Sequence, residues 1–200
     1  MERNVMKKIS LLSMTLFLLF GCTLAQVHVN VVSERTALEN QVLGSYNSLS
    51  QDVLLVASVR GVDPLGRIKT PPRKSREYQD TVGAVETLSF HADDVEFFKR
   101  LRWVGENNQG LLTPFPMDKK GVPEDLKEFA ARYQADEFNT VVQEVNRARE
   151  VVMVQVVEIN ENFSKEDLPK IRKVFGKLNR ENALPGEKVQ AEDGSWMIKP

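Results

Sequence analysis

Apolar residues recur at helical spacing over most of this chain. Between residues 36 and 60 they stand three or four positions apart and form one stripe on a helix. The residues of this stripe are Leu38, Val42, Tyr46, Leu49, Val53 and Val56. Thr36 and Glu39 have the spacing of a capping box, which closes the start of a helix. We therefore expect a helix over 36–60, ended by Gly61.

Four further segments show the same periodicity. They cover about 76–88, 93–103, 124–159 and 164–178. Residues 151–157 are rich in β-branched side chains, which favour strands, but the long helical pattern around them favours a helix. The sequence therefore predicts a chain built mainly from helices.

Two segments have strand signals instead. Valine alternates with polar residues over Val27–Val32, which is the period of a strand. Asp193–Gly194 is a two-residue hairpin turn signal, in a register that pairs Ala191 with Trp196. The predicted fold class is mainly α: a helical domain with a short N-terminal strand and a C-terminal β-hairpin that packs on it through Trp196.

The N-terminus has the layout of a bacterial lipoprotein signal. A basic start precedes an apolar stretch over 9–20, and Gly21 stands before Cys22, the one cysteine of the chain. The apolar stretch is too short to span a bilayer, which needs roughly 20 residues. We expect cleavage before Cys22 and acylation of its thiol. The alternative is an ordinary signal peptide that is cut after Ala25.

These signals divide the chain into four parts. Residues 1–21 form the signal peptide and 22–35 the lipidated tether with its strand. Residues 36–92 form a helical N-terminal region, with a basic, proline-rich linker at 61–75, and 93–200 form a helical domain with the terminal hairpin. The linker either contacts anionic lipid heads or is a solvated loop.

Composition narrows the class of partner. The net charge of the chain is −1, and it becomes −3 when residues 1–21 are removed. This balance gives no reason to expect nucleic acid as a partner. A single cysteine forms no intramolecular disulfide, and two histidines are too few for a multi-histidine zinc set. We expect no metal and no cofactor.

Four short motifs stand in order in the second half of the chain: V-G-E-x-x-x-G-x-L, N-x-x-R, P-G-E-x-V-Q and G-x-W-x-x-K. They are carried by Val104, Gly105, Glu106, Gly110, Leu112, Asn146, Arg149, Pro185, Gly186, Glu187, Val189, Gln190, Gly194, Trp196 and Lys199. With these motifs, residues of about 93–199 resemble the YdbL-like family of small exported bacterial proteins. The lipoprotein signal departs from typical members, which have a plain signal peptide, and residues 26–92 have no counterpart in short members.

The resemblance implies a role but no chemistry. Genes of this family often stand beside genes for a small lipoprotein and for a large AsmA-like protein thought to bridge two membranes. The implied role is that of a periplasmic accessory protein in envelope lipid traffic.

The residue after Cys22 bears on the membrane in which the protein is anchored. At this position aspartate favours the inner membrane. Because Thr23 is not aspartate, we expect the protein in the inner leaflet of the outer membrane.

Few residues offer reactive chemistry. Glu106 is the best candidate acid, and Glu187 is the second carboxylate of a catalytic pair if the fold brings the two together. The alternative is that Glu106 caps a helix or binds loop backbone. Asn146 and Arg149 share a helix face. Arg149 either pairs with Glu106 or Glu187 as a buried clamp, or presents its fork to a partner's carboxylate or phosphate.

Two functions follow. The first is a non-enzymatic interaction protein, fixed to a membrane by its lipid, that binds an AsmA-like envelope protein. In its sharper form Val27–Val32 adds to an open sheet edge of that partner, and the alternative is that this strand pairs with its own C-terminal hairpin. The second function is a lipid carrier or a cell-wall-acting enzyme that uses Glu106, which requires an apolar cavity of several hundred Å³.

Overall fold

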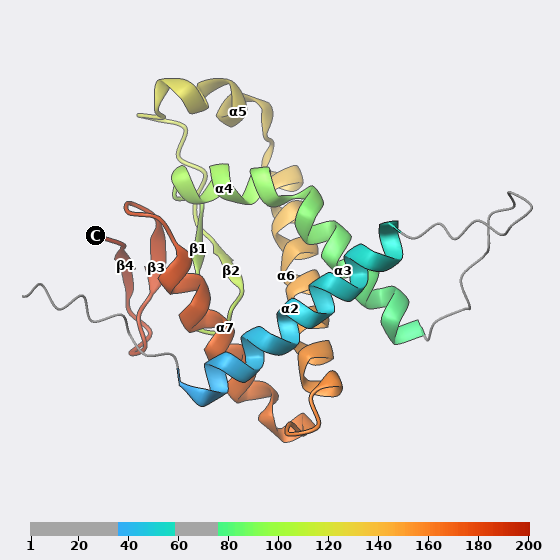
Figure 1. The fold of residues 1–200 in the computed structure, drawn as a ribbon. Coiled ribbons are helices and arrows are strands. Elements are labelled where there is room, and N and C mark those ends of the chain that lie inside the picture. Colours follow the sequence, from blue (N-terminus) through green and yellow to red (C-terminus); the bar gives the residue numbers. More distant parts are fainter. Residues whose placement is uncertain (1–35, 59–75) are drawn as a thin grey trace, which may run out of the picture. The chain divides into compact units, whose positions relative to one another are not determined.

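The fold is mainly α, as the periodicity predicts. The structure, a computed structural model, describes residues 36–58 and 76–200, and within them it has six α-helices and a four-stranded sheet (Figure 1). The helices are α2 (Ala37–Ser58), α3 (Arg76–Phe90), α4 (Ala92–Arg100), α5 (Lys127–Arg132), α6 (Ala135–Ile159) and α7 (Leu168–Asn182). The signal peptide, Cys22, the strand Val27–Val32 and the linker 61–75 lie outside the described residues.

The described helices form one unit. Residues Arg35–Pro200 are compact on their own, so the regions predicted at 36–92 and 93–200 pack together. None of the helices in the described ranges is both long and apolar enough to cross a membrane.

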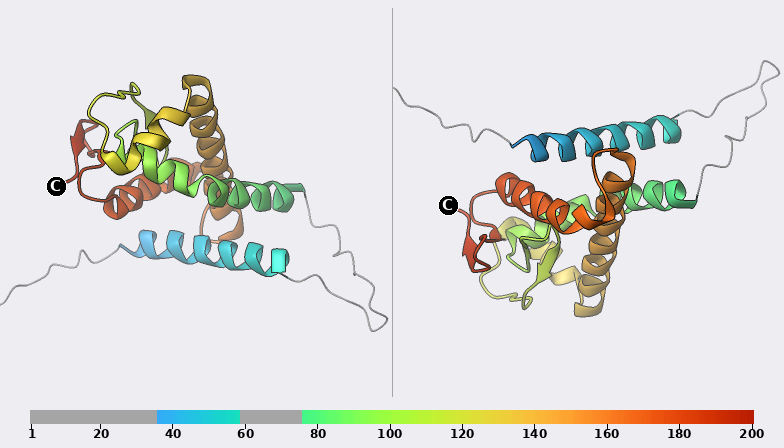
Figure 2. Two further views of the ribbon diagram at one scale, coloured as in Figure 1. Left: turned by 90° about the horizontal axis from the view of Figure 1, so that it is seen from above. Right: turned by 90° about the horizontal axis from the view of Figure 1, so that it is seen from below.

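Helix α6 lies at the centre of this unit. One face of it is buried along its whole length, from Phe138 to Val157. Helix α3 packs against α6, and α2 and α7 cover the C-terminal half of α6 (Figure 2). There Val42 of α2 meets Val156 and Ile171. Nearer the N-terminus of α6, Phe138 joins an aromatic cluster with Phe98 and Trp103. Because α6 is packed along its whole length, it stays helical through its β-branched residues 151–157.

Two helices begin at capping boxes, and the first of these boxes is the one that the sequence predicts. The Thr36 N–H donates to Glu39 Oε2 at 3.2 Å, and the Glu39 N–H donates to Thr36 Oγ1 at 3.3 Å. Ser164 and Asp167 form the second capping box, at a 3-10 turn (η2, Lys165–Asp167) that leads into α7. Each box satisfies two backbone groups that a helix end would otherwise leave unpaired.

The long helix predicted from Glu124 is wrong in its first third. A 3-10 turn (η1, Glu124–Leu126) and α5 precede a break at Tyr133 and Gln134, and α6 begins only at Ala135. Gln134 is extended and forms a capping box with Glu137. The break turns the Tyr133 ring against Phe98, at a centroid distance of 4.9 Å, and lets its hydroxyl donate to Asp94 at 2.5 Å. Core packing therefore overrides local periodicity here.

The helix expected over 93–103 also ends early, at Arg100. Arg102 has a φ of 59°, which lies in the left-handed region and stops the helix. The turn carries Trp103 into the core, where it is fully buried and its indole N–H donates to the carbonyl of Asp118 at 3.1 Å. The chain then enters a strand.

Half of the sheet was not predicted. Its strands are β1 (Val104–Glu106), β2 (Leu112–Pro114), β3 (Lys188–Gln190) and β4 (Trp196–Ile198), in the order β2-β1-β3-β4. β1 is antiparallel to β2 and parallel to β3. A three-residue strand is too short to show alternation, and β1 pairs with a strand about 80 positions away, so no local pattern indicates it.

The terminal hairpin forms, but its predicted register is wrong by one residue. Trp196 faces Gln190, not Ala191. The loop has three residues and ends in Gly194, with a φ of 87°, and Ala191 and Ser195 close it through a 2.8 Å backbone bond. This is the three-residue loop in which a left-handed glycine follows a turn. A shift of one residue changes the face on which each side chain of β4 lies.

An ion pair attaches α2 to α7 and makes stability depend on acid. Lys177 Nζ lies 2.6 Å from Oε1 of the buried Glu39 carboxylate, and this bond lowers the pKa of Glu39 below its ordinary value of 4.5. Because folding lowers the pKa of Glu39, its ion pair stabilises the folded state at pH values above 4.5. This contribution is lost as the pH falls through the pKa that Glu39 has in the folded protein.

We expect Glu39→Gln to flatten the dependence of unfolding on acid. In urea unfolding at pH values from 7 to 3, the wild type should lose more stability on acidification than the variant. Glu158→Gln, at an exposed position of α6, is the control and should behave like the wild type. Equal acid sensitivity of all three proteins would show that the ion pair of Glu39 does not contribute.

Candidate functional site

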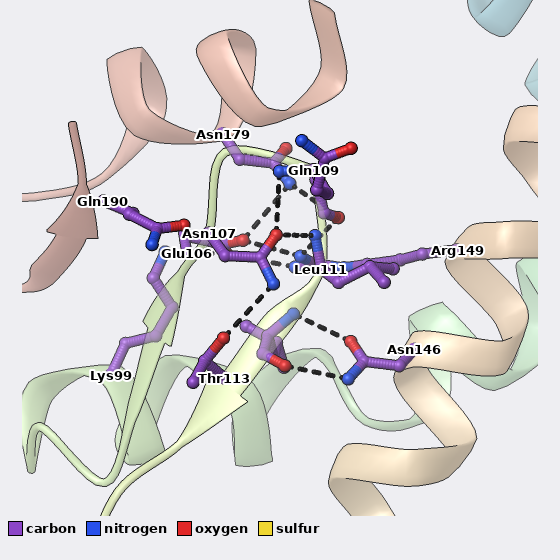
Figure 3. Close-up of polar contacts among 12 residues, drawn as sticks. Lys99, Glu106, Asn107, Gln109, Leu111, Thr113, Asn146, Arg149, Asn179 and Gln190 are labelled. Carbon is purple, nitrogen blue, oxygen red and sulfur yellow. Dashed lines mark hydrogen bonds and ion pairs between the residues drawn. The ribbon is translucent and has the colours of Figure 1, made fainter. Parts of the chain in front are cut away.

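The strongest polar feature of the described residues is a buried ion pair between β1 and α6. Arg149 Nη1 donates to Glu106 Oε2 at 2.6 Å, and Nη2 donates to Oε1 at 3.0 Å (Figure 3). Only 3% of the Glu106 side chain and 16% of the Arg149 side chain are exposed. This two-bond geometry is the one in which a guanidinium holds a carboxylate most firmly.

A second ion pair, between Lys99 and Glu187, lies beside the first, and the four charged groups together are neutral. Lys99, in the last turn of α4, places Nζ 2.9 Å from Oε2 of Glu187 and 3.7 Å from Oε1 of Glu106. Glu187 is also 3% exposed, and the same oxygen accepts the Leu184 N–H at 2.9 Å. Two cations and two carboxylates therefore share one interior site, which we call the four-charge network: Lys99, Glu106, Arg149 and Glu187. Buried charges are tolerated in proteins when they are paired in this way.

The loop after β1 is part of the same structure. The carbonyl of Gly110 accepts bonds from Arg149 Nη1 at 3.1 Å and from Asn179 Nδ2 at 3.3 Å, and Asn179 also donates to Glu106 Oε2 at 3.2 Å. Gly110 has a φ of 79°, and a Cβ there would lie 2.7 Å from the Cβ of Phe175. This position therefore requires glycine on two counts, conformation and space.

Asn107 shapes the loop. Its side-chain oxygen accepts the N–H groups of Gln109 and Leu111, at 2.9 and 3.0 Å, and its amide nitrogen donates to Thr113 Oγ1 at 3.2 Å (Figure 3). Gln190 Oε1 accepts the Asn108 N–H at 3.1 Å. Side chains thus replace the ladder bonds that this turn lacks.

Asn146 completes the edge of the sheet. Its Oδ1 accepts the N–H of Leu112 and its Nδ2 donates to the carbonyl of Leu112, each at 2.8 Å. Leu112 lies opposite Glu106 on the edge strand β2, at a non-hydrogen-bonded position of the antiparallel ladder, so its backbone groups point away from β1. One amide side chain from α6 therefore takes the place of a neighbouring strand.

The remaining motif residues also have structural partners. Trp196 lies over Gly105, where a Cβ would be 2.5 Å from Cζ3 of its ring, and it meets the Phe115 ring edge-on at a centroid distance of 4.9 Å. Gly186 has a φ of 91° and its carbonyl accepts a bond from Arg102 Nε at 3.0 Å. Lys199 Nζ donates to two carbonyls in the last turn of α7, those of Arg180 and Glu181. It thereby satisfies carbonyls that the helix leaves unpaired.

The structure brings the predicted motif residues together around the sheet and at its contacts with α6 and α7. The predicted clamp between Arg149 and Glu106 is present, and Glu187 joins the network through Lys99 and not through a direct bond to Arg149. Sequence reasoning missed Lys99, Asn107 and Asn179. Lys99 looks like an ordinary cation near a helix end, and Asn179 lies on α7 with no local sign that it faces β1. Only the Asn-Asn-Gln-Gly composition of residues 107–110 indicates a tight loop.

The network leaves Glu106 little capacity for acid–base chemistry. Its two oxygens accept three hydrogen bonds, and a fourth group, the ammonium of Lys99, stands beside them. A carboxylic acid that donates a proton at neutral pH is usually held in an apolar site or beside another carboxylate, which favours its neutral form. Here the groups nearest the carboxylate are the guanidinium of Arg149, the amide of Asn179 and the ammonium of Lys99, and together they occupy both oxygens.

His91 lies in a second, separate cluster. Its Nδ1 stands 3.1 Å from Oδ2 of Asp94 and its Nε2 3.0 Å from Oε2 of Glu144. The ring links the start of α4 to α6. Within 36–58 and 76–200, no three histidine, cysteine or acidic side chains are grouped in a way that would hold a metal ion.

A cavity of about 330 Å³ adjoins the network. It lies among α2, α3, α4, α6 and α7, and its apolar lining is Val42, Leu43, Tyr46, Leu88, Ala92, Val95, Val145, Val152, Met153, Phe175 and Leu178. Arg149, Asn179 and Asn182 are the polar side chains of the wall, whereas Glu106 does not line it. The structure thus has a cavity of the size that the carrier hypothesis requires, and Arg149, but not Glu106, lines it.

Comparison with known proteins adds no relative. A scan against protein families and searches of curated proteins and of solved structures gave no match. The resemblance to the YdbL-like family therefore stays a prediction from the four motifs.

Proposed function

We propose that this chain is a membrane-anchored envelope lipoprotein that acts as a non-enzymatic accessory protein and binds another envelope protein. The observation that carries the non-enzymatic part is the closure of the four-charge network. Glu106 is the best candidate acid in the sequence, and its two oxygens accept bonds from Arg149 and Asn179 and lie beside the ammonium of Lys99. The contacts of the motif residues hold the sheet against α6 and α7, and this structural role supports a non-enzymatic protein.

The anchor and the partner rest on the sequence. The basic start, the short apolar stretch and Gly21–Cys22 support acylation of Cys22. Thr23 supports the inner leaflet of the outer membrane, facing the periplasm. The motifs shared with the YdbL-like family support an AsmA-like protein as partner and intermembrane lipid transport as the process. This part of the proposal is an analogy between families and not an inference from chemistry.

Membrane fractionation combined with affinity capture tests the proposal. We expect the wild type in the outer membrane with its partner, and Cys22→Ala in the soluble periplasmic fraction without it. Thr23→Asp is the matched control, since it keeps the acylated thiol and should move the protein to the inner membrane. A soluble wild type, or a Cys22→Ala variant that stays in the outer membrane, would contradict the anchor. A correctly anchored wild type that captures no envelope protein would contradict the accessory role.

One observation favours a second candidate, a carrier of a small apolar molecule. The 330 Å³ cavity is within the size range of ligand pockets, roughly 300–1,000 Å³. Its wall is apolar except for a few polar groups at one side, as such pockets usually are. The enzyme form of this alternative has no such support, because Glu106 lies outside the cavity wall.

A further inference from the structure

We propose that this cavity binds a single-chain amphiphile, with the alkyl chain between the helices and an uncharged, hydrogen-bond-accepting head at the side of Arg149 and Asn179. The inference rests on the carrier candidate above and names its ligand class. It requires neither the acylation of Cys22 nor the envelope partner.

The apolar wall is suited to a slender chain. Helix α2 supplies Val42, Leu43 and Tyr46, and the opposite wall comes mainly from α4, α6 and α7. A methylene group is about as large as a water molecule, so 330 Å³ accommodates a chain of about ten carbons. An apolar space of this kind gains no stability from water, and an alkyl chain would restore the contacts that the wall lacks.

The polar side of the wall selects an acceptor. A guanidinium has five N–H donors. Three bonds of Arg149 go to Glu106 and Gly110, which leaves donors on its exposed fraction. Asn182 is exposed and marks the rim on this side. An alcohol or ester oxygen accepts a bond from such donors.

Charge argues against an ionised head. Glu106 already neutralises Arg149 in a two-bond pair, and Lys99 and Glu187 neutralise each other. An added carboxylate or phosphate would bring an unbalanced negative charge to a neutral, largely buried network, which costs desolvation without a free cation in return. The head is therefore a neutral acceptor, as in a fatty alcohol or an acylglycerol ester.

The α2 side of the wall is attached to α7 and to the end of α6 by apolar contacts and by polar bonds. The polar bonds include the one from Lys177 to Glu39 and a 2.9 Å bond from Asn160 Nδ2 to Ser45 Oγ. The Tyr46 ring meets Phe175 of α7 edge-on at 6.1 Å across the cavity. Binding of an alkyl chain along this wall leaves the four-charge network intact, because Lys99, Glu106 and Glu187 do not line the cavity.

A displacement assay with matched variants tests the inference. The full mature chain is titrated with the fluorescent apolar probe N-phenyl-1-naphthylamine, and the probe is then displaced by 1-decanol, decane or decanoate. Val95→Phe fills the cavity from α4, whereas Val154→Phe adds the same ring at a position of α6 that is 38% exposed and outside the cavity. Ala92→Phe, at the exposed rim, replaces Val95→Phe if that variant does not fold.

We expect saturable binding to the wild type, with 1-decanol displacing the probe more effectively than decanoate. Val95→Phe should weaken binding about tenfold or more, and Val154→Phe should leave it within about twofold of the wild type. Absence of saturable binding to the wild type, or equal binding to both variants, would overturn the site. Stronger displacement by decanoate would overturn the uncharged head. None of these results depends on where the protein fractionates or what it captures, so they are separable from failure of the anchor.

Discussion

Replacing Arg149 with methionine should lower the free energy of unfolding by about 3–5 kcal/mol, because removal of one partner leaves a buried charge without compensation. In this variant Glu106 and Glu187 share the single ammonium of Lys99, and the buried site carries one net negative charge. The carbonyl of Gly110 also loses its bond from Nη1. Urea unfolding at pH 7, followed by circular dichroism, measures the loss.

A second arginine–glutamate pair provides the control. Arg172 of α7 lies 2.8 Å from Glu150 of α6, but the two side chains are 35% and 31% exposed. Exposed pairs contribute little, typically about 0–1 kcal/mol, so Arg172→Met should cost no more than that. If both substitutions cost the same, burial of the four-charge network has no special importance for stability.

Replacing Gly176 with alanine should destabilise the protein by about 3 kcal/mol, near the upper end for an overpacked core. A Cβ on this residue of α7 would lie 2.4 Å from the carbonyl carbon of Asn108 and 2.5 Å from its oxygen. Both are backbone atoms of the loop that Asn107 and Gly110 hold in shape, so the helix and the loop would have to separate. The better helix propensity of alanine, worth about 1 kcal/mol, does not offset this clash.

Gly83 in α3 is the matched position. It also lies inside a helix, and a Cβ there would meet nothing within 4 Å. Gly83→Ala should therefore stabilise the protein by about 0.5–1 kcal/mol, through propensity alone. Thermal unfolding of the two variants should thus shift in opposite directions, and a shift of both in the same direction would mean that loop 107–110 yields to α7.

The helices could be predicted from the sequence better than the site could. Regular spacing of apolar residues, together with the capping pair Thr36 and Glu39, predicted α2, α3, α6 and α7, because these signals are local. The break at Tyr133 was missed because its cause is distant: the ring packs on Phe98, and the hydroxyl bonds to Asp94. A period calculated along the chain contains no information on such contacts.

The site was predictable only where two residues of opposite charge stood at positions that favour an ion pair between them. A glutamate in a glycine-rich segment and an arginine on a buried helix face suggested the clamp, and the structure places them together. Lys99 and Asn179 gave no such sign, because a lysine near a helix end is normally solvated. β1 and β2 were missed for a related reason, since their pairing depends on β3 and on Asn146, far away in sequence.

The measurement that most directly tests the structural role of the network is a double-mutant cycle on Glu106 and Arg149. The variants are Glu106→Leu, Arg149→Met and the double substitution, each unfolded in urea at pH 7. Either single substitution leaves one buried charge unbalanced, whereas the double variant keeps only the Lys99–Glu187 pair and is neutral again. We predict that the double variant recovers most of the stability that each single variant loses. Losses that simply add would contradict the closed clamp, and Glu106 would then be free to act on a molecule from outside.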